Sequence, residues 1–225
     1  MSDADYPSFA HLFVRQARWQ RPLYIHLLKF DDNVVWTMSA IVQSLARSPN
    51  PASEICALLN GMDWREHLVG GVASILGQQQ SAPVIAALWA AFDEGSWVSP
   101  QLAVVASLVD PEFAEHARAR ILRHCLGVPD RTERESALVR SVVSGPGGDY
   151  QRSCKALAAL VEVAQHTPAL RPWLLAQRQT AAIQQRLQDD ADAGAGIARS
   201  WRAACIQLCQ ECVQLFRQQL RSPAV

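Results

Sequence analysis

Three cysteines near the C-terminus form a cluster whose spacing suggests metal chemistry. They are Cys205, Cys209 and Cys212, in a C-x3-C-x2-C pattern. Thiolates so close in sequence can bind zinc, copper or an iron–sulfur cluster. The pattern falls within a long expected helix, however, where positions i, i+4 and i+7 share one face. Cysteine also packs in cores as a small hydrophobic residue, and that face carries several apolar residues: Trp201, Leu208, Leu215 and Phe216.

The same cysteine spacing is similar to the iron–sulfur motif of radical S-adenosylmethionine enzymes. In those enzymes the cysteines lie on a loop of an α/β barrel, whereas here they fall within a helix of a helical chain. We therefore predict that the three cysteines pack in a core and that the protein has no cofactor and no metal. A thiolate metal site within a helical bundle is kept as the alternative.

Other chemical motifs are missing from the sequence. The six histidines include no H-x3-H pair, and neither G-x-S-x-G nor H-E-x-x-H occurs. The glycine-rich segment 145–148 is not followed by the Gly-Lys-Ser/Thr of a phosphate-binding loop. The sequence therefore predicts a protein that is not an enzyme.

Composition and charge exclude further classes. The chain has 225 residues, 49% of them hydrophobic and 19% charged, which is typical of a globular protein. Its 21 basic and 21 acidic residues leave no net charge for binding nucleic acid. No apolar run is long enough for a membrane helix, and the first residues lack the basic segment of a secretory signal. We expect a cytoplasmic protein that binds neither nucleic acid nor membrane.

Apolar residues recur at intervals of three and four, and no segment shows the alternation of a strand. This pattern predicts an all-α fold of nine to eleven helices with no sheet. We expect one domain over 1–225, which a loop at 144–149 could divide into parts 1–143 and 150–225. Asp31, Asp32 and Asn33 are expected to cap the third helix. The candidate helical segments lie over 7–19, 22–30, 34–47, 53–60, 64–76, 83–92, 97–109, 111–126, 130–143, 150–166, 168–187 and 197–220.

Two consecutive helix pairs repeat one another. The second helices align at an offset of 33 residues, which places Trp64 on Trp97, and the first helices align at an offset of 30. Repeats of this length are typical of α-solenoids. The segment from Asp63 to Gly77 resembles the second-helix consensus of short HEAT-like repeats, and the resemblance covers about residues 50–126. The second copy departs from the pattern, with Val98 in place of arginine.

The resemblance implies a stack of helical hairpins that binds proteins, with the two tryptophans in equivalent layers. HEAT-like DNA glycosylases are strongly basic, and the neutral charge argues against that function. Residues 1–110 have a net charge of −4 and residues 111–225 of +4, which suits a partner of mixed charge or head-to-tail contact between copies. The candidate partner-binding residues are Asp63, Arg65, Asp93, Glu94, Arg120 and Arg123.

We therefore predict a non-enzymatic protein-binding scaffold. Small HEAT-like bacterial proteins resemble the immunity proteins that neutralise secreted toxins, and 19 arginines against 2 lysines are typical of a GC-rich bacterium. The acidic residues at helix ends could imitate the phosphates that a nuclease toxin binds, or could act only as helix caps. An adaptor or chaperone of a secretion system is the alternative. The acidic residues concerned are Asp31, Asp32, Asp63, Asp93 and Glu94.

Overall fold

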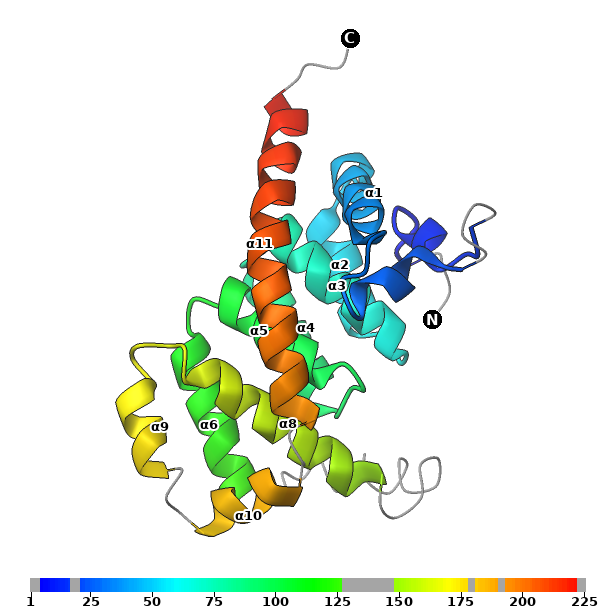
Figure 1. The fold of residues 1–225 in the computed structure, drawn as a ribbon. Helices are drawn as coiled ribbons and strands as arrows, with labels where there is room; N and C mark the ends of the chain where they lie inside the picture. The colour runs from blue at the N-terminus through cyan, green and yellow to red at the C-terminus, as the bar shows by residue number, and fades with distance from the viewer. Residues whose placement is uncertain (1–4, 17–20, 127–147, 178–180, 190–192, 222–225) are drawn as a thin grey trace. The chain divides into compact units, whose positions relative to one another are not determined.

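The computed structural model describes residues 5–16, 21–126, 148–177, 181–189 and 193–221. These residues form ten α-helices and two short 3₁₀ helices, and they include no strand (Figure 1). The predicted all-α class is confirmed. Among the described residues, no helix has both the length and the apolar character needed to span a membrane.

The chain divides into two compact units. Unit 1 comprises residues 1–90 and 201–225, and unit 2 comprises residues 91–200. Both boundaries fall inside helices, namely α4 (Ala82–Asp93) and α11 (Ala193–Arg221). The helix predicted over 130–143 and most of the predicted dividing loop at 144–149 lie outside the described residues and remain predictions. The end of that loop is wrong, since residues 148 and 149 already belong to α8 (Gly148–Ala164).

Unit 1 is built on an α-helical hairpin. Helix α2 (Pro51–Leu59) packs along α3 (Trp64–Leu76), and α3 also contacts α1 (Val34–Arg47). Close packing between α2 and α3 requires a glycine, because a Cβ on Gly70 would lie 3.0 Å from the Cβ of Leu58. The bounds predicted for α1 and α3 are confirmed at every residue. The core of this unit is apolar, and its fully buried side chains include Met38, Ile41, Leu58, Leu68 and Leu76.

The N-terminal segment of unit 1 is less helical than predicted. In place of α-helices over 22–30 and over the described part of 7–19, which ends at residue 16, it has 3₁₀ helices, η1 (Ala10–Leu12) and η2 (Leu23–Leu27). Phe30 lies three residues beyond η2, and its φ of 48° is in the left-handed region that a helix excludes, so the helix predicted over 22–30 cannot continue through it. Its ring packs against Trp201 with centroids 4.9 Å apart, and this contact helps to hold the strained backbone.

The start of α1 is not capped by the side chain at its N-cap position, although the sequence predicts such a cap. Asn33 occupies the N-cap position, but its side chain makes no capping hydrogen bond. The Asp31 carboxylate instead accepts a hydrogen bond from the backbone N–H of Asn33 and one from His26, at 3.0 and 2.8 Å. Burial raises the pKa of Asp31, but these hydrogen bonds outweigh it and the pKa lies below its usual value.

Unit 2 is organised around α8 (Gly148–Ala164). Its partners are α5 (Ser99–Val109), α6 (Phe113–Leu126), α9 (Arg171–Gln177) and α10 (Ala181–Asp189) (Figure 1). The C-terminal half of α8 is buried on every side and rich in alanine, which allows neighbouring helices to approach closely. The single helix predicted over 168–187 is wrong, since two helices occupy it.

The two tryptophans of the proposed repeat differ in their surroundings. Trp64 is the first residue of α3 and packs edge-on against Tyr24, at 5.8 Å between centroids. Trp97 precedes α5, which begins at Ser99 beside Pro100, and its side chain is 59% exposed. The predicted helix start at Trp97 is therefore wrong, because proline favours the first turn of a helix and sets the start two residues later.

Helix α11 also begins earlier than predicted, at Ala193 in place of Ile197. Gly194 allows this early start, because a Cβ at this position would lie 2.1 Å from the backbone oxygen of Lys155. We expect Gly194→Ala to destabilise the fold by about 1–3 kcal/mol through overpacking. Gly196→Ala is the matched control, since a Cβ there meets nothing within 4 Å and alanine favours helix. Urea denaturation of both variants measures the difference, and equal stabilities would contradict this account.

A second prediction concerns Gln101, which is 5% exposed within α5. Its Oε1 atom is buried and has no hydrogen-bond partner among the described residues. An unsatisfied buried amide costs about 1–3 kcal/mol, so Gln101→Met should raise the free energy of unfolding by about 1 kcal/mol. Thermal and urea denaturation measure this change, and a variant less stable than the wild type would show that the amide is satisfied.

Candidate functional site

The turn between α2 and α3 brings together the best-defined polar network in unit 1. Asp63 caps α3 as predicted, and its Oδ1 accepts the backbone N–H of Arg65 at 3.1 Å. Glu66 completes a capping box, since its Oε2 accepts the backbone N–H of Asp63 at 3.3 Å. The other oxygen of Glu66 accepts the hydroxyl of Tyr6 at 2.6 Å. The start of α3 is therefore tied both to its own turn and to the N-terminal segment.

Gly61 leaves the space that this network needs. A Cβ at Gly61 would lie 1.9 Å from the Glu66 carboxylate, so no other residue fits without moving that side chain. The carbonyl oxygen of Gly61 lies 2.7 Å from Nε2 of the buried His67. These contacts hold both sides of the turn in one conformation.

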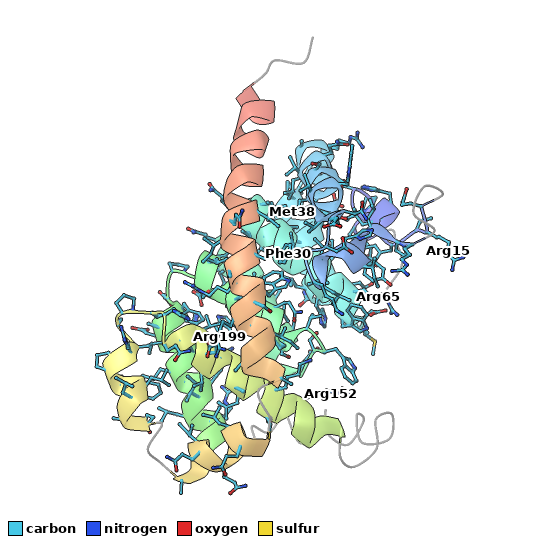
Figure 2. All side chains as sticks on the ribbon, in the orientation of Figure 1. Arg15, Phe30, Met38, Arg65, Arg152 and Arg199 are labelled. Atoms are coloured by element: carbon cyan, nitrogen blue, oxygen red, sulfur yellow. The ribbon has the colours of Figure 1, made fainter. Side chains whose placement is uncertain are left out.

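Arg65 lies against two aromatic rings. Its guanidinium carbon is 4.9 Å from the centroid of Trp64 and 5.8 Å from that of Tyr24. Nε donates to the hydroxyl of Tyr24 at 2.8 Å, and Nη1 pairs with the carboxylate of Asp63. The hydrogen bond to Asp63 is the main reason that the pKa of Arg65 is raised. The side chain is 42% exposed, and Figure 2 labels it.

Met62 projects from this turn into solvent. It is 96% exposed, which is unusual for a large apolar side chain in a rigid segment. Asp63, Trp64 and Arg65, which follow it in the sequence, are half-buried. Methionine, aromatic residues and arginine are the types enriched in protein interfaces. We call Met62, Asp63, Trp64 and Arg65 the turn surface.

The other predicted partner-binding residues belong to unit 2, and three of them contact one another. Asp93 forms two hydrogen bonds with Arg120, at 2.8 and 2.7 Å, and lies 3.8 Å from Arg123. Asp93 is thus the last residue of α4 and an anchor for α6, and it does not cap a following helix. Glu94 is exposed beside it. The sequence missed the ion pair because its two residues lie 27 positions apart.

Charge is not separated between the units. By sequence, unit 1 has 9 basic and 8 acidic residues, and unit 2 has 12 basic and 13 acidic residues. The −4 and +4 halves of the sequence therefore do not correspond to the units of the fold. Complementary charge must be sought in local clusters.

The cysteines give no metal centre in the part of the chain that is described. Cys205 is completely buried in α11, and the side chains of Cys209 and Cys212 lie outside the described residues. Among described side chains, no group of three histidine, cysteine, aspartate or glutamate residues could hold a metal ion. Burial raises the pKa of the Cys56 thiol, which makes that residue less nucleophilic.

Buried carboxylates form further networks that sequence reasoning missed. Glu54 of α2 is 6% exposed and accepts hydrogen bonds from Ser8 and Ser48, at 2.8 and 2.6 Å. Asp110 accepts a hydrogen bond from the backbone of Glu112 and lies 2.7 Å from Nδ1 of His116. Each arrangement fixes the start of a helix or a preceding loop. In the sequence, the only indication of the Glu54 network is that Glu54 is a polar residue on an otherwise apolar helix face.

Comparison with protein families, with curated proteins and with solved structures finds no significant match to this chain. The geometry of the turn surface is therefore the basis on which a function can be proposed.

The buried Glu162 of α8 gives a prediction about pH. The two hydrogen bonds from Arg199, at 2.8 and 3.1 Å, lower its pKa below the usual 4.5 and outweigh the opposing effect of burial. A carboxyl with a lowered folded-state pKa stabilises the protein above its unfolded pKa and loses this contribution as pH falls through the folded value. We expect Arg199→Met to raise the Glu162 pKa in an NMR titration.

The stability difference between wild type and Arg199→Met should accordingly be full at neutral pH and fade below about pH 4.5. Arg171→Met is the control, because Arg171 is exposed in the same unit. A difference that persists at low pH would mean that Arg199 acts through packing alone.

Proposed function

We propose that this chain is a non-enzymatic scaffold that binds another protein through the turn surface. The observation that carries the proposal is the 96% exposure of Met62 on a turn held by a capping box and by Tyr6. Nothing in the folding of unit 1 requires an apolar side chain in solvent at this place. Burial of the Met62 side chain against a partner would explain why an apolar residue is exposed there.

The rigidity of the turn favours binding. Ordering a flexible loop costs free energy on association, and a turn that is already ordered avoids most of that cost. Arg65, stacked on Trp64, presents a planar group of donors that suits a carboxylate of the partner. Asp63 beside it adds an acceptor, so the turn surface suits a partner of mixed charge.

For the fold, we propose a HEAT-like solenoid. The α2–α3 hairpin and the sequence repeat around it support this proposal. The exposure of Trp97 weakens the correspondence in the second copy. Solenoids bind partners along extended surfaces formed by successive hairpins. The turn surface would then be one end of such a surface.

The finer function proposal is a cytoplasmic immunity protein that neutralises a toxin acting in the cytosol. The exposed Asp31 and Asp32 support it, because carboxylates can occupy the phosphate-binding site of a nuclease. The competing proposal is an adaptor or chaperone of a secretion system, which would use the same turn surface on a different partner.

The test begins with co-expression of the neighbouring gene. If that gene encodes a toxin, this protein should restore growth and co-purify with the toxin. A toxic neighbour that is neither neutralised nor bound would exclude the immunity proposal and favour the adaptor. Iron, zinc or copper bound stoichiometrically, and lost when Cys205, Cys209 and Cys212 are all replaced by alanine, would favour the metal-binding alternative.

Variants then test the turn surface itself against the captured partner. We expect Met62→Ser to weaken binding about 5–30-fold and Arg65→Ala by about 30-fold or more, as interface hot spots do. Leu175→Ser is the matched control, since Leu175 is also apolar and 57% exposed but lies in unit 2. Calorimetric titration measures the affinities. Unchanged binding by both turn variants would place the docking surface elsewhere.

A further inference from the structure

The two described methionines lie at opposite extremes of exposure. Met38 is completely buried in the core of unit 1, where Figure 2 labels it, whereas Met62 is 96% exposed at the turn between α2 and α3. The third methionine, Met1, lies outside the described residues. Within the described part of unit 1, one thioether is therefore open to reagents in solution and the other is shielded from them.

A thioether in solvent can be oxidised by a peroxide. The sulfur lone pair attacks one oxygen of hydrogen peroxide, an S–O bond forms as the O–O bond breaks, and the displaced hydroxide takes the proton of the transferred OH group and leaves as water. The sulfur loses two electrons and the peroxide gains them. The product is methionine sulfoxide, which is polar and is returned to methionine by methionine sulfoxide reductases.

The described thiols compete poorly for such an oxidant. Cys154 and Cys205 are buried, and burial raises the pKa of the Cys56 thiol, so that little of the reactive thiolate is present at neutral pH. Among the described sulfur-containing side chains, Met62 is the most exposed. A peroxide therefore reaches its sulfur more easily than any other in this part of the chain.

Oxidation at this place should leave the fold intact. The turn is held by the capping box of Asp63 and Glu66 and by the contact between Gly61 and His67, and the side chain of Met62 takes part in neither. A sulfoxide in a core disrupts packing, but one on a side chain that is already in solvent displaces nothing. The chemical change is therefore confined to the turn surface.

We propose that Met62 is a reversible oxidation site and that its sulfoxide weakens binding of the partner protein. An apolar side chain stabilises an interface by leaving water, whereas a sulfoxide oxygen keeps its water unless the partner supplies a hydrogen-bond donor. Oxidising conditions then release the partner, and a reductase restores binding. The selective oxidation follows from exposure alone, whereas the effect on binding rests on the proposed function of the turn surface.

The first part of the test needs no partner. The protein is treated with dilute hydrogen peroxide, and trypsin then separates the two methionines, because Arg47 lies between them. Mass spectrometry with fragmentation should show Met62 oxidised about tenfold or more faster than Met38. The urea midpoint should stay unchanged while only Met62 is modified. Comparable rates, or unfolding that accompanies the modification of Met62, would overturn the proposal.

The second part measures affinity for the captured partner, with Met62→Leu as the matched control. Leucine keeps the size and the apolar character but has no thioether, so this variant should bind like the wild type and be insensitive to peroxide. Peroxide should weaken binding by the wild type about 5–30-fold, as Met62→Ser does, and methionine sulfoxide reductase should restore it. An equal loss in both proteins would assign the effect to another oxidised group and overturn the proposal.

The outcomes separate this proposal from the proposed function. If Met62→Ser leaves binding unchanged, the turn surface is not the docking site, and the effect of oxidation on binding fails with it. The peptide measurement still decides whether Met62 is the preferred oxidation site. If Met62→Ser weakens binding but the sulfoxide does not, the docking surface stands and the oxidation switch alone is wrong.

Discussion

Unit 1 depends on one hydrogen bond between residues 174 positions apart in the chain. The indole N–H of Trp201 donates to the carbonyl oxygen of Leu27 at 2.8 Å, and Trp201 is 3% exposed. A buried carbonyl at the end of a 3₁₀ helix is costly without a donor, and the last helix supplies one. The Phe30 ring packs on the same indole, so one tryptophan satisfies the backbone and supports a left-handed residue.

Local signals in the sequence predicted the elements whose limits are set locally. The bounds of α1 and α3 follow from apolar periodicity, and that of α3 also from its aspartate cap, since a capping box forms within four residues. The helix predicted over 22–30 cannot extend through Phe30, because the left-handed backbone of Phe30 is supported by Trp201, which lies far away in the sequence. The helix start predicted at Trp97 was wrong because a proline three residues later determines where α5 begins.

The candidate site was predictable only in part. Asp63 and Arg65 were expected at the turn, but the stacking of Arg65 on Tyr24 joins residues 41 positions apart and leaves no local pattern. The exposure of Met62 had no signal either, since methionine is usually buried. Asp93 was expected as a cap or a partner contact, and its pairing with Arg120 shows how a tertiary ion pair can occupy a residue that looks available.

The division of the chain has a consequence for how the protein is made. Unit 2 is a continuous segment, whereas unit 1 contains both ends of the sequence, so unit 2 is in effect an insertion within unit 1. During synthesis, unit 1 lacks Trp201 until the whole of unit 2 has been translated. Until then the Leu27 carbonyl and the Phe30 turn lack their partner, while unit 2 can already begin to fold. A chain shortened before residue 201 would keep the α2–α3 hairpin but lose the contact that closes unit 1.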